Sequence, residues 1–297
     1  MMAGQTQALG QIRGYTNRHS VFRNSSGNLS NADNDRYYTS LMNGVAESPA
    51  LTYLLNMGHM SLKDYRSLGQ YNALNTAAEV AAARGLEEVT DGSQIALPAP
   101  RPPRGKLVDA LESRRSTRAF NSATQLTVAE MSSHLKYSFG LALREQHFGE
   151  AVVPTRYYPS GGGLYPVTVN LCIERVAGIG RGIYRYQPYS HTLLPIGDDV
   201  DITGLLEGDG FDLHHAGGVI LYQYDLDRTY LKYGELSLLN ILVEVGNMAL
   251  AFDLTGAALR IGTCQVAGYN RWQAEQALHL DGVNSYVVFA QLFGKMK

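Results

Sequence analysis

Apolar residues recur along the chain with two different periods, which predict strands and helices respectively. An alternating, β-branched run predicts a strand at 167–176. Two apolar runs predict further strands at 217–225 and 285–294. The segment GIYRYQPYSHTLLPIG predicts two short strands on either side of a turn at 188–191.

Helical spacing of apolar residues appears between these strands. Thr127 followed by Glu130 forms a capping box, which predicts a helix that runs to Leu143. The segment 231–262 predicts a long helix that is apolar almost all round, so it must be buried in a large core or in a subunit interface. Strands and helices interleave with long connections, so we expect an α+β fold with a sheet covered by helices.

The first hundred residues differ in composition from the rest of the chain. Residues 1–35 are rich in Asn, Ser, Gly and Gln without periodicity, which predicts a flexible arm. A helical pattern follows and predicts a small N-terminal extension over 36–95. The proline-rich segment 96–105 is the predicted linker, and 106–297 is the predicted main domain.

Composition and charge narrow the functional classes. The chain has 297 residues, 45% of them hydrophobic and 18% charged, as in ordinary globular proteins. A net charge of −2 gives no field that would attract nucleic acid or an anionic membrane. The apolar segment 236–259 contains Glu244 and Asp253, too much charge for a membrane span. With two cysteines in apolar surroundings and no apolar signal segment, we expect a soluble cytoplasmic protein.

A glycine-rich loop stands directly before the first of these strands. It comprises Pro159, Ser160, Gly161, Gly162 and Gly163. Successive glycines allow positive φ and let the backbone approach another group without a Cβ in the way. Such a loop suits a flat or phosphorylated ligand, and the alternative is a plain turn.

A basic cluster follows the short helix predicted at about 107–113. Arg114, Ser116 and Arg118 are spaced at i, i+2 and i+4, so an extended segment places all three on one side. Two guanidiniums and a hydroxyl that point the same way make a phosphate site. The alternative is a basic turn that only faces water.

Two further places could carry proton chemistry. Lys232 and Tyr233 lie between an apolar strand and the long helix, where partial burial would lower the pKa of the lysine and let it act as a base. The alternative is a lysine that extends to water. Glu244, in the middle of the apolar helix, must be paired or hydrogen-bonded, either structurally within a dimer or around a cofactor. The histidines and carboxylates have no metal-ligand spacing, so no metal site is predicted.

Together these motifs resemble the nitroreductase superfamily, and more narrowly its SagB-type branch of flavin-dependent azoline dehydrogenases. The resemblance covers about residues 107–294 and rests on ESRRSTRAF, RYYPSGGGLYPV, GIYRYQPYSHTL, KY followed by ExG, and IGTCQVAGY. The glycine loop followed by GIYRY is the more specific signal, whereas RRSTR marks only the superfamily. The chain departs from the pattern at Leu250 and Ala251, where relatives commonly carry Gln and Asn.

The resemblance implies an α+β nitroreductase fold and a homodimer with FMN at the dimer interface. By matching positions, the FMN phosphate and ribityl chain would contact Arg114, Ser116 and Arg118, and Lys295 would reach the phosphate. The loop 159–163 would lie along the flavin ring, and the segment from Cys264 to Gly268 would pass near it.

The resemblance also implies an activity. Lys232 and Tyr233 match a catalytic pair that takes a proton from a thiazoline or oxazoline ring of a ribosomal precursor peptide while hydride leaves for FMN, with O₂ as the final oxidant. A cyclodehydratase would be the partner that closes the rings beforehand. Two alternatives stay open: an NAD(P)H-dependent nitro or quinone reductase, and a scaffold subunit of a cyclodehydratase complex.

Overall fold

The computed structural model describes residues 87–148, 151–197, 201–207 and 210–297. They all belong to the second of two units into which the chain divides, 1–69 and 70–297. The predicted arm and most of the predicted helical extension therefore lie outside the described residues, and the division into domains stays a prediction.

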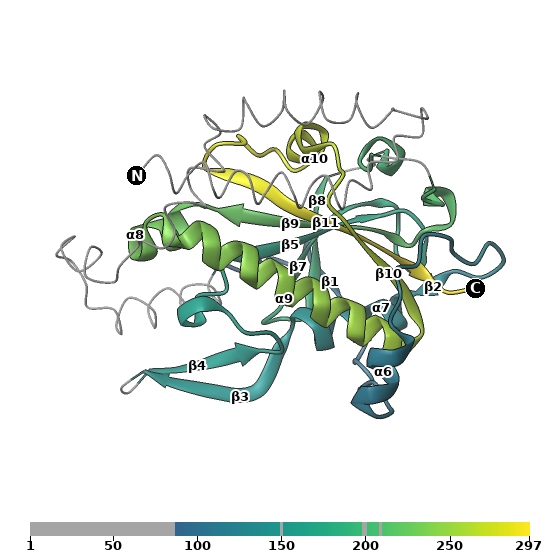
Figure 1. The fold of residues 1–297 in the computed structure, drawn as a ribbon, viewed down its shortest axis with the longest axis horizontal. Coiled ribbons are helices and arrows are strands. Elements are labelled where there is room, and N and C mark those ends of the chain that lie inside the picture. The colour runs from purple at the N-terminus through teal and green to yellow at the C-terminus, as the bar shows by residue number, and fades with distance from the viewer. Residues whose placement is uncertain (1–86, 149–150, 198–200, 208–209) are drawn as a thin grey trace, which may run out of the picture. The chain divides into compact units, whose positions relative to one another are not determined.

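An antiparallel sheet of seven strands forms the centre of the described unit (Figure 1). Each strand pairs antiparallel with its neighbours. The strand order is β1 (Ile95–Ala96), β8 (Thr192–Gly197), β7 (Gly182–Gln187), β5 (Val167–Ile173), β9 (Gly218–Asp225), β11 (Ser285–Lys295) and β10 (Ile261–Val266). The predicted strands and the predicted hairpin at 188–191 are confirmed, as is the α+β class.

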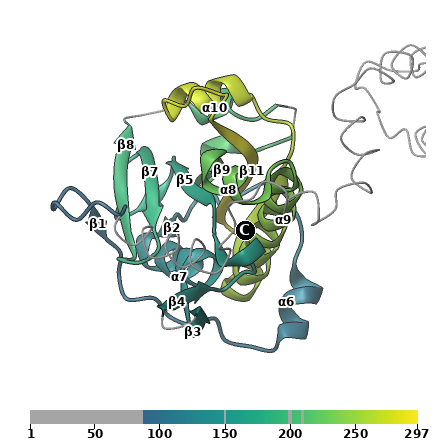
Figure 2. The ribbon, with the colours of Figure 1, turned by 90° about the vertical axis from the view of Figure 1, so that its left-hand side faces the viewer.

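Helices cover both faces of this sheet (Figure 2). They are α6 (Leu107–Ser113), α7 (Val128–Phe139), α8 (Asp227–Tyr233), α9 (Leu236–Leu259) and α10 (Arg271–Ala277). Short 3₁₀ turns are η2 (Gly161–Gly163), η3 (Ile202–Gly204) and η4 (Leu213–His215). Two small two-stranded pairs complete the unit: β2 (Leu126–Thr127) with β6 (Val176–Ala177), and β3 (Leu141–Phe148) with β4 (Ala151–Arg156).

The helix α7 begins as predicted and ends earlier than predicted. The Thr127 side chain accepts from the Glu130 amide, and the Glu130 carboxylate accepts from the Thr127 amide, so the capping box is confirmed. The helix stops at Phe139 and not at Leu143, because Gly140 leaves the helical conformation with an extended backbone. The apolar residues that follow continue as the strand β3, which Figure 1 shows extending away from the main sheet together with β4.

Two buried clusters lie on opposite faces of the sheet. On one face α7 and α9 pack their apolar residues against β5 and β9, as where Phe139 stacks on Phe252 with ring centroids 5.2 Å apart. On the other face α10 and η3 pack through residues such as Ala274 and Ile202. The sheet thus lies between two helical layers, which removes its apolar surface from water.

The long helix α9 has one buried face and one exposed apolar stripe. Glu244, Met248 and Phe252 point into the core and are at most 2% exposed. Leu242 and Val243 are more than half exposed, and Leu250 is 46% exposed. The expectation that this helix is buried on every side within one core is therefore wrong for the single chain, and burial in a subunit interface stays a prediction.

By length and composition α9 could cross a membrane, yet its buried face is built into the domain. Asp253, in its last third, accepts from Thr263 Oγ1 at 2.6 Å, from Gln265 Nε2 at 2.8 Å and from Gln291 Nε2 at 2.6 Å. A buried carboxylate with three donors from the neighbouring strands is satisfied where it lies. These bonds fix α9 to β10 and β11 as a core helix.

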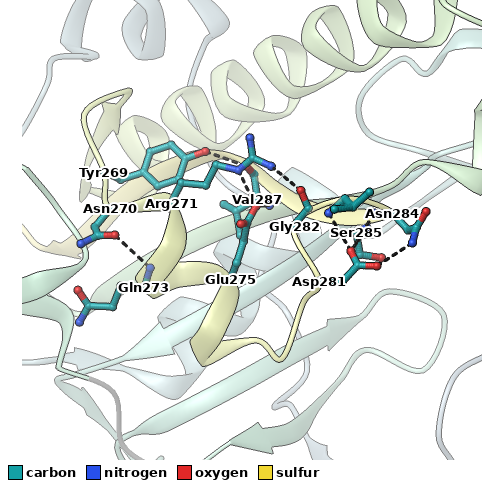
Figure 3. A network of polar contacts seen from close by, with 11 residues as sticks. Tyr269, Asn270, Arg271, Gln273, Glu275, Asp281, Gly282, Asn284, Ser285 and Val287 are labelled. Atoms are coloured by element: carbon teal, nitrogen blue, oxygen red, sulfur yellow. Dashed lines mark hydrogen bonds and ion pairs between the residues drawn. The ribbon is translucent and has the colours of Figure 1, made fainter.

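A polar network fixes the loop between α10 and β11 (Figure 3). Asp281 accepts from the backbone amides of Val283, Asn284 and Ser285, and these bonds hold the pKa of its carboxyl far below the ordinary value. Arg271 bridges the Glu275 carboxylate and the Gly282 carbonyl. The start of β11 is thereby positioned beside β9.

Candidate functional site

The glycine loop closes as the 3₁₀ turn η2 between β4 and β5. Gly162 and Gly163 have φ of 65° and 67°, so the predicted left-handed backbone is confirmed at both. A Cβ at Gly161 would come within 3.4 Å of the Asn240 side chain on α9. The loop therefore approaches the helix closely, while Pro159, Gly161 and Gly162 remain exposed on its outer side.

The loop is fastened through Ser160. Its hydroxyl donates to the Glu244 carboxylate, in one of the shortest hydrogen bonds of the structure, and accepts from the Tyr165 amide at 2.8 Å. Glu244 is 2% exposed. The sequence required a partner for this buried carboxylate, and the structure provides it from the glycine loop.

The basic cluster runs along the edge strand β10. Ser116 forms a parallel bridge with Thr263, and the Thr117 amide donates to the Thr263 carbonyl at 2.7 Å. Residues alternate in this extended segment, so Arg114, Ser116 and Arg118 share one side. Ser116 and Arg118 are exposed and Arg114 is half-buried.

Cys264 on β10 lies beside Arg114, Ser116 and Arg118, which together form the basic row. Burial raises the pKa of its thiol, and the positive charge of Arg118 and a hydrogen bond with Ser116 oppose that rise. The effects of both residues on one sulfur place them on the Cys264 side of the strand. Three predicted site residues, Ser116, Arg118 and Cys264, are therefore brought together.

In one chain the glycine loop and the basic row meet different parts of α9. The loop is bound at Glu244, whereas the segment beside the row is tied through Thr263 to Asp253. Nine residues of helix correspond to about 14 Å along the axis. The structure thus presents two separate halves of the predicted site.

Two further predicted residues, Gly268 and Lys295, make contacts of their own. The Gly268 carbonyl accepts from the Glu207 amide at 2.8 Å, just beyond β10. Lys295 pairs with Glu130 at the start of α7, and it also borders a groove of about 660 Å³ lined by Lys106, Arg260 and other residues. The Lys295 ammonium is thus bonded to the Glu130 carboxylate.

The predicted proton-transfer pair lies at the end of α8. Tyr233 is half-buried, and burial raises the pKa of its phenol. Lys232 precedes it in the helix, and the lysine side chain lies outside the described part of the structure. At neutral pH Tyr233 keeps its proton, so it can donate a hydrogen bond or a proton.

A buried guanidinium was not predicted from the sequence. Arg156, at the end of β4, is 7% exposed and donates through Nη1 to the Tyr158 hydroxyl at 2.8 Å. Its backbone amide donates to the Tyr165 hydroxyl at 3.1 Å. No local sequence pattern predicts that Arg156 is buried, because the burial of the tyrosines around it depends on tertiary packing alone.

Within the described residues, no group of three or more His, Cys, Asp or Glu side chains could hold a metal ion. The site is thus built from guanidiniums, hydroxyls, a phenol, glycine backbone and one buried carboxylate. Such a donor set suits an anionic, largely planar cofactor.

Comparison with known families matches residues 111–295 to the model of the nitroreductase family. The chain belongs to the nitroreductase family. The match spans the basic row, the glycine loop, α9 and the last strand, and the α+β nitroreductase fold expected from the sequence is confirmed. Membership of this family indicates an oxidoreductase.

Two curated proteins are similar in sequence to this chain. A Methanocaldococcus jannaschii protein named as a nitroreductase is 28% identical over 169 residues, covering 55% of this chain and 79% of its own. The microcin B17-processing protein McbC of Escherichia coli is 29% identical over 150 residues, covering 47% of this chain and 54% of its own. The alignment thus spans about half of McbC.

A solved structure superposes on nearly the whole chain. A chain of the Escherichia coli microcin synthetase McbBCD complex, solved with truncated pro-MccB17 bound, has a TM-score of 0.51 and 19% identity. The superposition covers 92% of this chain and 99% of that one. It supports the fold.

The basic row has the chemistry that the phosphate of FMN needs. Among the described residues neither Arg114 nor Arg118 has an ion-pair partner, although carboxylates pair with Arg228 and Arg271 elsewhere. Guanidiniums held on one side of an extended segment without a carboxylate are ready to bind an oxyanion. The residues present therefore fit the phosphate end of the cofactor.

Proposed function

We propose that this protein is an FMN-dependent dehydrogenase that oxidises thiazoline or oxazoline rings of a ribosomally made peptide to thiazoles or oxazoles. The observation that carries the flavin assignment is the open row of Arg114, Ser116 and Arg118 beside Cys264. The substrate class rests on the sequence similarity to McbC, a protein that processes microcin B17.

In this proposal the cofactor is held from several elements. Arg114, Ser116 and Arg118 bind the phosphate and ribityl end, while Pro159, Ser160 and the glycines of η2 lie along the ring. Glu244 supports the ring indirectly, because its carboxylate positions the Ser160 hydroxyl. Cys264 and Gly268 border the site from β10, and Lys295 joins the phosphate by leaving Glu130.

A homodimer would unite the two halves of the site. The stripe of Leu242, Val243, Gly246 and Leu250 on α9 is apolar and exposed in the single chain, and a Cβ at Gly246 would meet nothing within 4 Å. Leu250, one of the departures from the family pattern, belongs to this stripe. Packing it against a second chain would remove the stripe from water and bring the partner's glycine loop toward the basic row.

The proton chemistry is assigned to the end of α8. FMN, when bound, accepts a hydride from the ring. Lys232 takes the proton from the ring Cα, and Tyr233, whose phenol keeps its proton, orients the ring nitrogen. Loss of one hydride and one proton aromatises the ring, and O₂ is the final electron acceptor.

The peptide would arrive from a cyclodehydratase that closes the azoline rings, within a cytoplasmic complex. The complex of the solved microcin synthetase supports this partnership. A second candidate is an NAD(P)H-dependent nitro or quinone reductase, favoured by the similarity to the Methanocaldococcus jannaschii nitroreductase. A scaffold subunit without bound flavin is the third.

The absorbance spectrum of the purified protein distinguishes these candidates. A yellow protein that is bleached anaerobically by an azoline-bearing peptide, with loss of two hydrogens per ring, supports the dehydrogenase. Bleaching by NAD(P)H alone supports the reductase. A colourless protein that assembles with a cyclodehydratase supports the scaffold and contradicts the first two.

A further inference from the structure

A pocket of about 240 Å³ lies on the sheet, away from the basic row. Its walls come from β5, from the β7–β8 hairpin, and from residues 87–89, which cross over the hairpin. Three arginines are among its lining residues: Arg156, Arg185 and Arg228. Buried cations are costly unless other groups balance their charge, so the partners of these three arginines must be identified.

Arg156 is the most buried of the three. It is 7% exposed, and its guanidinium lies over the ring of Tyr165 at 5.1 Å. Among the described residues no carboxylate lies within ion-pair distance, and Glu244 acts on it only at longer range. One nitrogen bonds to Tyr158, and the residue lines the pocket.

Arg185, on β7, is the second guanidinium. Its Nε is buried, and within the described part of the chain it has no hydrogen-bond partner. Burial lowers the pKa of its guanidinium; the carboxylate of Asp225 opposes this and the charge of Arg228 adds to it. A desolvated guanidinium without a bonded acceptor is costly, so an acceptor in the pocket would stabilise it.

The carboxylates around the pocket are already bound to other groups. Glu87 pairs with Arg228 at 3.0 Å, and Asp225 pairs with the same arginine at 2.8 Å. Glu88 accepts from the Tyr189 and Ser190 amides at 2.7 Å and 2.8 Å, capping the hairpin turn. Arg228 is thereby neutralised, and Arg156 and Arg185 are the two cations that face the pocket without a bonded carboxylate in the described structure.

We propose that this pocket binds a carboxylate of the peptide substrate through Arg185. This assignment of the substrate rests on the proposed function. A singly charged carboxylate suits the pocket better than a phosphate dianion, because Glu87 and Glu88 also line it and would repel a second negative charge.

The position of the pocket links it to the proposed chemistry. Arg228 lies in α8, one turn before Lys232. On the other side, the Arg156 amide bonds to Tyr165, whose own amide bonds to Ser160 of the glycine loop. A carboxylate in the pocket would therefore hold the peptide between the loop and the end of α8.

Binding is tested on the whole protein with a small probe. N-acetylglycine, its neutral amide N-acetylglycinamide, and inorganic phosphate are titrated separately, with Kd taken from NMR. We expect N-acetylglycine to bind, the amide not to bind, and Arg185→Gln to weaken the acid about tenfold or more. The matched control is Arg181→Gln, whose side chain is about half exposed and pairs with Glu174 outside the pocket. Equal binding of acid and amide, no effect of Arg185→Gln, or tighter binding of phosphate would overturn the assignment.

Kinetics then separate this inference from the proposed function. Three azoline peptides are compared: one with a free C-terminus, one with an acidic side chain, and one with neither. For the peptide whose carboxylate binds in the pocket, Arg185→Gln should raise KM at least tenfold and leave kcat unchanged. If azolines are oxidised but KM changes neither with the variant nor with the carboxylates of the peptide, the inference is overturned and the proposed function stands. Carboxylate binding without any azoline oxidation would keep the pocket and overturn the function.

Discussion

The hydroxyl of Ser160 donates to the carboxylate of Glu244, although 84 residues separate them in the chain. The bond joins the glycine loop to the middle of α9, and the same hydroxyl accepts from the Tyr165 amide. One side chain thus bonds to a buried carboxylate and fixes the turn before β5. The conformation of the loop depends on α9 and not on its glycines alone.

Replacing this hydroxyl tests that dependence. Ser160→Ala removes the hydrogen bonds that this hydroxyl makes with the Glu244 carboxylate and with the Tyr165 amide, so we expect the free energy of unfolding to fall by about 1–3 kcal/mol. Urea denaturation measures the loss. Ser93→Ala is the matched control, because the Ser93 hydroxyl bonds to Asp91 at an exposed site and should change stability by less than about 0.5 kcal/mol. Equal losses in the two variants would show that the bond to Glu244 contributes nothing.

Two arginines of the extended segment that carries the basic row give a matched pair of variants that tests cofactor binding. Arg118→Ala removes a guanidinium on the Cys264 side of the extended segment, and we expect FMN affinity to fall roughly ten- to a hundredfold. Arg115→Ala alters the other side of the same segment and should leave affinity unchanged. Flavin fluorescence titration of each apoprotein measures both values. An unchanged Kd for FMN in Arg118→Ala would show that the phosphate binds elsewhere.

The elements of the fold follow largely from local patterns. Alternation marked β5, an apolar run marked β9, Thr127 and Glu130 marked the start of α7, and successive glycines marked the positive φ of η2. Each of these signals depends on backbone sterics or on a hydrogen bond within a few residues. The end of α7 was missed because Gly140 interrupts an apolar pattern that otherwise continues into β3.

The site was predicted less completely, because much of it depends on distant contacts. The sequence marked Arg118 and Cys264 separately, and only the pairing of 116 with 263 brings them together. Arg156 became a pocket residue through burial by Tyr158 and Tyr165. The sequence also required a partner for Glu244 without indicating that Ser160 would be that partner.

The stripe on α9 predicts how the chains associate. Leu242→Glu places a charge on an exposed apolar position, 59% open in the single chain, so the monomer should keep its stability while a dimer is lost. Sedimentation equilibrium measures the mass, and we expect wild type to be dimeric and the variant monomeric. Val283→Glu is the control, because Val283 is 70% exposed and lies on the loop before β11. A variant that remains dimeric would place the interface elsewhere.

The end of α8 predicts a separation of cofactor binding from turnover. Lys232→Ala should retain FMN, since no phosphate contact is removed, and should slow azole formation about a hundredfold or more through loss of the base. Mass spectrometry counts the oxidised rings, and the visible spectrum reports flavin occupancy. Lys297→Ala, at the end of the chain, is a control that should behave as wild type. Full activity in Lys232→Ala would assign the base to another group.

Stability should depend on pH through a buried histidine in α7. His134 stacks on Phe252 and donates from Nε2 to the Phe252 carbonyl at 2.8 Å, and burial lowers the pKa of its imidazole from 6.5 to about 4. Between these pH values the unfolded chain binds more protons than the folded one, so stability is full above pH 6.5 and falls as the pH falls toward 4. The loss should reach about 2 kcal/mol at pH 5 and about 3 kcal/mol at pH 4.

Urea denaturation at pH 7.5, 6, 5 and 4 measures this loss, and His134→Gln isolates the contribution of His134. The amide can still donate to the Phe252 carbonyl and does not titrate, so the variant should lose less stability than wild type over the same range. His191, whose pKa burial and the charge of Lys136 also lower to about 4, remains in both proteins and leaves the variant a residual slope. Parallel curves for the two proteins would contradict a neutral buried His134.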